Sequence, residues 1–397
     1  MDFAFTREDE QFRRDVREWL KREIPKRWYE LRPGESEESE EIWRLVREFD
    51  RKLAAKGWYA PSYPRDYGGM EATVMQEYIL AEEKALLSAP RKLSEAIGVQ
   101  FVGPTIMRYG NQEQKERYVN GIGHAEIVFC LGYSEPQAGS DLGSVQTRAL
   151  QEGDSFIING QKIFTTFAHY ADYCWLLARS DPNVPKHKGL SLFIVDMKTP
   201  GITVRPLINI LGSHSFNEVF FDNVRIPRRS LVGEQSRGWE YLMTALTYER
   251  SFTSGPATMI GMLKDLVRYA KETPTESGVL ADDPYVQQKL AEMATDVAVS
   301  RLLTLRIVDM ESRGMIPTYE VSVAFVFGME VAKRFAKKAG EILGLYGQLA
   351  KGARCTPLGG TIQTMWLETI AAGVGGGSAE IQRSIIAVLG LGLPRAI

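Results

Sequence analysis

The part of the chain best suited to hold a ligand is residues 133–141, with the sequence Tyr-Ser-Glu-Pro-Gln-Ala-Gly-Ser-Asp. Pro136 and its small neighbours disfavour both a helix and a central strand, so the segment predicts a loop. Gly139 allows the backbone to approach a bound molecule closely, and Ser134 and Ser140 offer hydroxyl groups to it. Taken alone, the same residues are also compatible with an ordinary polar turn.

A second candidate is the glycine-rich segment at residues 373–379, Gly-Val-Gly-Gly-Gly-Ser-Ala. It comes close to a dinucleotide-binding fingerprint, but Ser378 replaces the last glycine. That fingerprint also follows a strand, whereas residues 366–372 look helical. A glycine-rich turn that opens a helix can still present backbone N–H groups to an anion or a carbonyl. The alternative interpretation is a flexible break between two helices.

Other kinds of chemistry find little support. No Gly-x-Ser-x-Gly elbow is present to anchor a hydrolase triad, and there is no Walker sequence. The histidines are scattered without i, i+4 spacing, so we expect no metal site. They are His124, His169, His187 and His214. The three cysteines, Cys130, Cys174 and Cys355, form no CxxC and are expected to be buried free thiols.

The period of the apolar residues divides the chain into three stretches. Helical spacing dominates the first, and its second stripe ends near Gly57, a predicted C-terminal cap. In the middle stretch, Asn159-Gly160 predicts a hairpin turn because both residue types tolerate positive φ. Strands without intervening helices indicate a small antiparallel barrel or sandwich, and the returning helical period indicates a bundle. The predicted helices are 12–24, 42–53, 78–81, 106–118, 242–246, 290–307, 321–344 and 381–389, and the predicted strands are 156–158, 161–164, 173–178, 190–195 and 218–221.

The bulk composition limits the classes of function. At 397 residues the chain can hold two or three domains. Its 48 basic and 50 acidic residues leave a net charge of −2, so no basic surplus attracts nucleic acid. The amino terminus has no signal-peptide pattern, and no apolar run reaches the ~20 residues that span a bilayer. We therefore expect a cytoplasmic protein in a reducing compartment.

Three segments, in this order, resemble the acyl-CoA dehydrogenase family of flavoenzymes. They are residues 133–141, Gly-Gln-Lys-Ile-Phe-Thr-Thr at 160–166, and Gly-Gly-Gly-Ser-Ala-Glu-Ile-Gln-Arg at 375–383. The resemblance covers essentially the whole chain and implies an α+β multidomain fold. The implied parts are an N-terminal helical domain over 1–128, a central antiparallel β-barrel or sandwich domain over 129–236, and a C-terminal helical bundle over 237–397.

The resemblance also implies FAD as the cofactor and a tetramer that oxidises acyl-CoA in fatty acid or lipid catabolism. Electrons would leave to an electron-transfer flavoprotein. Phe164 would stack near the isoalloxazine ring, and Thr166 would hydrogen-bond to the flavin N5 edge. The full set implied to bind the cofactor is Leu131, Tyr133, Ser134, Gly139, Ser140, Phe164, Thr165, Thr166, Glu341, Gly344, Ser378 and Glu380. The residues implied to bind the substrate are Ser140, Tyr248, Arg250 and Gly377.

The reaction requires a base that removes the α-proton beside the thioester, and a carboxylate whose pKa is raised by burial can serve. Many family members place this glutamate where the present chain has Gly376. Isovaleryl- and long-chain-type members place it instead on a bundle helix, directly before an arginine. The matching residues here are Glu249 and Arg250, so the resemblance implies Glu249 as the base. The backbone N–H of Gly376 would hydrogen-bond to the thioester carbonyl, and the missing side chain would leave room for a branched or bulky acyl group.

Two features depart from the family pattern. The arginine and phenylalanine that commonly reach FAD across a subunit interface are missing from residues 269–275. The usual glutamine near the start of the Ile-Leu-Gly turn is Glu341, which would repel a pyrophosphate unless it were paired. The resemblance therefore allows a homotetramer or a heterotetramer whose second, related subunit completes the FAD site.

Two alternatives remain open at this point. One is a flavin monooxygenase on the same fold, which needs no α-proton base. The other is a partner subunit of a heteromeric acyl-CoA dehydrogenase that binds acyl-CoA or completes another chain's site. Glu249 argues against the first, while the missing arginine and Glu341 favour the second to some degree.

Overall fold

The computed structural model describes residues 5–31, 39–91, 93–249, 255–371, 373–375 and 377–394, with the side chains of all but 93–94 and 245–249. The chain forms two compact units. We call residues 1–35, 73–90 and 250–397 the helical unit, and residues 36–72 and 91–249 the sheet unit. Each unit is assembled from segments far apart in the sequence.

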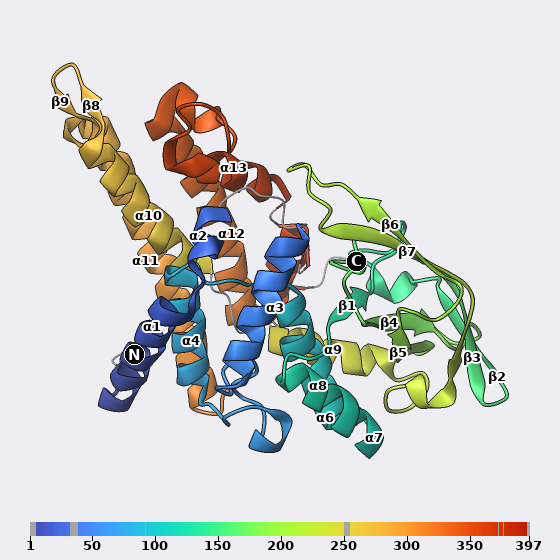
Figure 1. Ribbon diagram of the computed structural model, residues 1–397. Helices are drawn as coiled ribbons and strands as arrows, with labels where there is room; N and C mark the ends of the chain where they lie inside the picture. Colours follow the sequence, from blue (N-terminus) through green and yellow to red (C-terminus); the bar gives the residue numbers. More distant parts are fainter. Residues whose placement is uncertain are drawn as a thin grey trace. The chain divides into compact units, whose positions relative to one another are not determined.

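The helical unit contains long helices from both ends of the chain. Figure 1 shows α10, α11 and α12 running side by side, and α1 beside α4. Its core consists of apolar side chains such as Leu266, Met293, Val297, Val331, Phe335 and Ala339. The elements are α1 (Arg7–Glu23), α2 (Lys26–Leu31), α4 (Val74–Leu86), α10 (Gly255–Glu272), β8 (Pro274–Thr275), β9 (Gly278–Val279), α11 (Pro284–Ser312), α12 (Tyr319–Leu343), α13 (Thr361–Ala371) and α14 (Ala379–Ile385).

The sheet unit surrounds a curled seven-stranded sheet. Its helices are α3 (Glu40–Ala54), α5 (Leu93–Ala96), α6 (Gly103–Tyr109), α7 (Gln112–Gln114), α8 (Asn120–Gly123) and α9 (Gly238–Glu249). Its strands are β1 (Phe129–Gly132), β2 (Arg148–Glu152), β3 (Ser155–Lys162), β4 (Tyr173–Arg179), β5 (Leu190–Asp196), β6 (Ile202–Leu207) and β7 (Phe216–Pro227). The strand order is β1-β4-β2-β3-β7-β6, and β5 pairs with β4. The pairs of β4 with β1 and β2 are parallel and all others antiparallel, so the predicted antiparallel sheet is slightly mixed.

Short 3-10 and π turns complete both units and connect the longer elements. The 3-10 turns are Arg65–Tyr67, Leu142–Ser144, Arg228–Ser230, Leu280–Asp282, Gly344–Gln348 and Pro357–Gly360. The π turns are Ile97–Val102, Lys115–Val119 and Ile386–Gly390. The order of helices, then strands, then helices confirms the predicted fold class.

The hairpin predicted at Asn159-Gly160 is wrong. β3 continues through both residues, and the turn lies instead at Gly153-Asp154, between the paired residues Glu152 and Ser155. Gly160 sits at a register shift against β7 with a φ of +152°, and a Cβ there would lie 2.5 Å from the hydroxyl of Thr147. The Asn-Gly pair therefore lies at a β-bulge in a continuous strand. Sequence alone does not distinguish the two uses, because both need a residue that tolerates positive φ.

The cysteine prediction holds for two of three residues. Cys130 and Cys174 are buried and directly paired in register between β1 and β4. Cys355 is exposed, contrary to expectation. It lies in a turn outside any helix or strand, with a φ of +64°.

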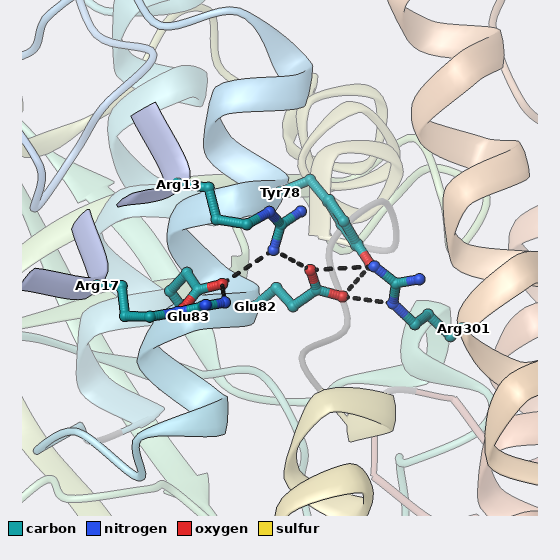
Figure 2. Close-up of polar contacts among 6 residues, drawn as sticks. All are labelled: Arg13, Arg17, Tyr78, Glu82, Glu83 and Arg301. Carbon is teal, nitrogen blue, oxygen red and sulfur yellow. Dashed lines mark hydrogen bonds and ion pairs between the residues drawn. The ribbon is translucent and has the colours of Figure 1, made fainter. Parts of the chain in front are cut away.

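A buried carboxylate, Glu82, joins three helices of the helical unit. It lies on α4 and accepts hydrogen bonds from Arg13 of α1 at 2.5 Å and from Arg301 of α11 at 2.6 Å. Tyr78, one turn earlier on α4, donates to the same carboxylate. Burial acts to raise the pKa of Glu82, but Arg301, Tyr78 and Arg13 outweigh it and hold that pKa below its ordinary value. Figure 2 shows Arg13 and Arg301 reaching Glu82 from two other helices, beside Tyr78 of the same helix.

The adjacent Glu83 extends this cluster. Its side chain is fully buried. The carboxylate accepts hydrogen bonds from two nitrogens of Arg17, both at 2.7 Å, and from Arg13 at 2.9 Å (Figure 2). The remaining face of Arg13 lies over the ring of Phe5, 4.5 Å from its centroid. These contacts connect α1 to α4, and Glu82 connects α4 to α11, so together they help the helical unit form from distant segments.

Replacing Glu82 with glutamine should destabilise the helical unit. The substitution removes the negative charge from between Arg13 and Arg301, and breaking a buried ion pair on one side typically costs about 3–5 kcal/mol. We expect the urea midpoint of helix unfolding, followed by circular dichroism at neutral pH, to fall accordingly. Because the folded-state pKa of Glu82 is depressed, its contribution is complete above about pH 4.5 and is lost as the pH falls through the folded-state pKa. The difference between wild type and Glu82→Gln should therefore shrink in acid.

The matched control is Glu152→Gln, which breaks an ion pair with Arg225 whose two side chains are about 60% exposed. Solvent screens such a pair, so its unfolding curve should overlay that of the wild type. Equal shifts of the urea midpoint in both variants would show that the burial of Glu82 adds nothing to the stability of its ion pairs.

Candidate active site

The sheet unit brings two of the three sequence segments together. The loop over 133–141 follows β1, and the turn over 164–166 follows β3. The carbonyl of Ser134 accepts a hydrogen bond from the backbone N–H of Ile163 at 2.9 Å, so the loop lies along the end of β3. Ser134 thereby comes close to Phe164, as the resemblance implies for residues on one side of a cofactor.

Glu135 fixes the loop through a buried ion pair. Its carboxylate accepts from Lys162 Nζ at 2.8 Å and from the backbone N–H groups of Gln146 and Thr147. Lys162 is fully buried and also donates to the carbonyl of Tyr133 at 3.0 Å. Burial acts to raise the pKa of Glu135, but Lys162 and the N–H of Gln146 hold that pKa below its ordinary value. The Ser-Glu-Pro glutamate is thus a structural anchor of the loop.

The tip of the loop is open. Glu135 and Ala138 exchange two backbone hydrogen bonds of 3.0 Å, which close a tight turn. Gly139 and Ser140, just beyond it, are exposed, and a Cβ added to Gly139 would meet no atom within 4 Å. The tip therefore has room for a ligand on the side where Gly139 lacks a side chain. Upstream, Leu131 is half-buried on β1, and Tyr133 is buried with its hydroxyl accepting from Trp175.

The turn after β3 presents an aromatic ring to its surroundings. Phe164 is 62% exposed and has a φ of +55°, a conformation that non-glycine residues rarely adopt. Thr165 is fully buried, and its hydroxyl has no hydrogen-bond partner among the described residues. Thr166 is half-buried. An exposed ring beside threonine and serine hydroxyls fits a planar flavin, which needs a stacking surface and hydrogen-bond donors at its edge.

Glu341 lies at the end of α12 in the helical unit and is paired. Lys289 of α11 forms an ion pair with its carboxylate. The hydrogen bond from Lys289 lowers the pKa of Glu341, and Glu341 in turn raises the pKa of Lys289. Lys289 therefore offsets the charge that would repel a pyrophosphate. No signal in the sequence pointed to Lys289, because it lies on a different helix, 52 residues away.

The glycine-rich segment forms the turn before α14. Gly377 has a φ of +91°, which favours glycine, and Ser378 caps the helix by accepting from the N–H of Ile381 at 3.3 Å. The buried side chain of Gln382 accepts from the hydroxyl of Ser322 and packs where a Cβ on Gly377 would lie. Gln382 thus anchors the turn, although the sequence analysis assigned it no role.

The remaining predicted residues are described in part or not at all. Gly344 ends α12 with a φ of +59°. Glu380 is exposed in the first turn of α14, and its own backbone N–H lowers its pKa. Glu249 and Tyr248 lie on α9, but their side chains fall outside the described part of the structure. Arg250 and Gly376 lie outside the described residues altogether.

Among the residues that the structure describes, no group of three or more histidine, cysteine, aspartate or glutamate side chains could hold a metal ion. None of their helices is both long and apolar enough to cross a membrane.

Comparison with family models covers most of the chain. The acyl-CoA dehydrogenase N-terminal domain matches residues 6–126, the middle domain matches 130–224 and the C-terminal domain matches 236–389. All three segments that first suggested the family lie within these matches. The three matches also follow the order of helices, strands and helices seen in the structure.

Individual relatives agree with the family models. The chain is 32% identical to acyl-CoA dehydrogenase FadE26 of Mycobacterium tuberculosis, with 100% of both chains covered. Among solved structures, the ChsE4-ChsE5 complex from Mycobacterium tuberculosis aligns with a TM-score of 0.89 at 32% identity, covering 100% of both chains. The Tcur3481-Tcur3483 steroid ACAD aligns with a TM-score of 0.88 at 30% identity over the same coverage. The chain therefore belongs to the acyl-CoA dehydrogenase family, the FAD-dependent oxidoreductases that introduce an α,β double bond into acyl-CoA thioesters.

Proposed function

We propose that Glu249 is the base that removes the α-proton of the acyl-CoA thioester. The observation that supports it is the way the sheet unit holds α9, the helix that ends at Glu249. The N-terminus of α9 lies so close to β5 that a Cβ on Gly238 would be 2.6 Å from the Cα of Ser191. Tyr241 is buried on α9 and stacks on Tyr109 at 4.1 Å between ring centroids. The helix of the proposed base and the proposed flavin-side residues thus belong to one compact unit.

The proposed roles of the other residues follow from their chemistry. Phe164 would stack on FAD, and Ser134, Ser140, Thr165 and Thr166 would offer it hydroxyls. FAD supplies, when bound, the acceptor of the β-hydrogen as a hydride. Glu341, Gly344, Gly377, Ser378 and Glu380 are proposed as further cofactor contacts. The backbone N–H of Gly376 would polarise the thioester carbonyl, and Tyr248 and Arg250 would contact the substrate.

We propose a branched or bulky acyl group as the substrate. Glycine at 376 would leave free the space that a glutamate side chain fills in many family members. The steroid ACAD named above has a related sequence and the same fold over its full length, which supports a large substrate for this chain as well.

We further propose a tetramer that includes a second, related subunit and passes electrons to an electron-transfer flavoprotein. The missing arginine and phenylalanine in residues 269–275 support this assembly. The ChsE4-ChsE5 relative is itself a complex of two named components. The three-part division at residues 128 and 236 and the cytoplasmic location stay predictions.

Substituting Glu249 with glutamine should abolish most of the proton removal. The amide keeps the size of the side chain but cannot accept a proton, and general-base catalysis typically contributes about 10²–10⁴-fold. We expect anaerobic bleaching of the flavin by acyl-CoA to slow by that factor with unchanged FAD content, measured by stopped-flow absorbance. Glu240→Gln, on the first turn of the same helix, is the control and should bleach at the wild-type rate.

Wild-type bleaching by Glu249→Gln would reject the assignment. If that variant also consumed oxygen when its flavin was reduced chemically, the flavin monooxygenase would be the better interpretation.

The substrate proposal predicts a ranking of thioesters. Branched and steroid side-chain acyl-CoA should give a kcat/KM at least about ten-fold above that of butyryl-CoA, because filling a hydrophobic pocket by additional methylenes is worth about that much or more. Steady-state assays with an artificial electron acceptor measure the ratio. A preference for short, straight chains would contradict the proposal.

The assembly proposal predicts that the chain purified alone binds FAD below full occupancy. Visible absorbance gives the ratio of flavin to protein, and light scattering gives the mass. Adding a related subunit from the same organism should raise both. A flavin-saturated tetramer of this chain alone would establish the homotetramer instead.

A further inference from the structure

Asn217, on β7, holds the turn that contains Phe164 and Thr165. Its side chain is fully buried. The backbones of Asn217 and Thr165 exchange two hydrogen bonds, each 3.0 Å long. The side-chain Nδ2 of Asn217 adds a third by donating to the carbonyl of Thr165, also at 3.0 Å. One residue of β7 thus makes three of the hydrogen bonds that fix Thr165.

The orientation of this amide determines the protonation of two histidines. The carbonyl of Thr165 can only accept, so the amide nitrogen of Asn217 must face it and the amide oxygen must face the other way. That oxygen lies 3.1 Å from His169 Nδ1 and 2.7 Å from His214 Nε2. Because an amide oxygen only accepts, both ring nitrogens must carry a proton. For the neutral rings, the structure therefore assigns different tautomers: Nδ1–H for His169 and Nε2–H for His214.

The two rings stack on each other, and His169 also contacts a neighbouring aromatic ring at a tilt. His169 and His214 lie 3.9 Å apart between centroids at an angle of 17°. His169 also lies 4.3 Å from the ring of Tyr170, and Tyr170 stacks on Trp43 of α3 at 4.3 Å. β7 therefore supplies Asn217, whose amide oxygen accepts from both histidines. The rings themselves pack toward α3 of the same unit through Tyr170 and Trp43.

The turn needs such support because its backbone is strained. Phe164 and Phe167 have φ values of +55° and +51°, and neither is glycine. Such conformations persist only where the surroundings impose them, and they concentrate at functional sites. The N–H of Phe167 also donates to the carbonyl of Ser215 at 2.9 Å, two residues before Asn217. The strained turn is thus attached to one short segment of chain that leads into β7.

We propose that Asn217, His169 and His214 are positioning residues that set the orientation of Phe164 and Thr166 toward the flavin. The proposal rests on the proposed function of Phe164 and Thr166 as flavin contacts. Asn217 acts through Thr165, and the histidines act through Asn217 by polarising its amide and fixing its rotamer. None of the three touches the reacting atoms.

The first test needs no activity. Nitrogen-15 NMR of the full chain with labelled histidine reports which ring nitrogen carries the proton. The chain has four histidines, and spectra of His169→Gln and His214→Gln assign the two resonance sets. We expect the Nδ1–H form for His169 and the Nε2–H form for His214 at neutral pH. Nε2–H forms for both rings would overturn the proposal.

The second test compares two substitutions of the half-buried His214 in the FAD-loaded enzyme. His214→Phe keeps a ring but loses the donor, so we expect flavin bleaching by acyl-CoA to slow about five-fold, the order of one net hydrogen bond. The visible circular dichroism of the flavin should change, while KM and FAD content stay the same. His214→Gln restores an N–H donor and should recover both the rate and the spectrum. His124→Phe, which alters only a local contact with Asn120, is the control.

The outcomes separate this proposal from the proposed function. An unchanged rate and spectrum in folded His214→Phe would reject the positioning role. So would a His214→Gln variant as slow as His214→Phe, because filling the space would then matter and the hydrogen bond would not. If Glu249→Gln stayed active while the tautomers and the flavin spectrum behaved as expected, the proposed base would be wrong and the positioning unit would stand.

Discussion

Burying a carboxylate is costly unless nearby donors occupy its oxygens, and both units of this protein are built around that constraint. In the helical unit, Glu82 and Glu83 collect arginines from α1 and α11. In the sheet unit, Glu135 collects Lys162 and two backbone N–H groups. In each case the charged donors lie at least 27 residues away in the sequence. The need to satisfy a buried charge therefore specifies which segments must meet.

The two buried arrangements serve different ends. The glutamates of α4 join the N-terminal helices to the bundle formed by the second half of the chain. Glu135 instead shapes a loop whose tip stays open, and it does so beside the turn that exposes Phe164. A rigid base beneath an open tip is what a binding loop requires, because the ligand then meets a preformed surface. The strained φ of Phe164 fits the same interpretation, since stable surroundings can hold an unfavourable local conformation.

Some family features proved informative because this chain lacks them. Glycine at 376 directs attention to Glu249 as the base. Glu341 would repel a pyrophosphate, and in the structure Lys289 pairs with it and offsets its charge. The Asn159-Gly160 pair gives the opposite lesson. Of the two residues only Gly160 has a positive φ, and the structure uses it at a bulge within β3. Residue type thus predicted the unusual φ of Gly160, whereas the pairing of β3 with β7 determined that it forms a bulge and not a hairpin turn.

The sequence by itself determined the family and the order of helices and strands, because these depend on periodicity and on short motifs contiguous along the chain. It also located Phe164 and the loop with Ser134, which are local features. Only the tertiary structure decided the partners: Lys162 for Glu135, Lys289 for Glu341, and Asn217 for Thr165. Each pair joins residues 27 to 52 positions apart. No local preference encodes such a pairing, since it arises when whole strands and helices pack and their buried polar groups must find each other.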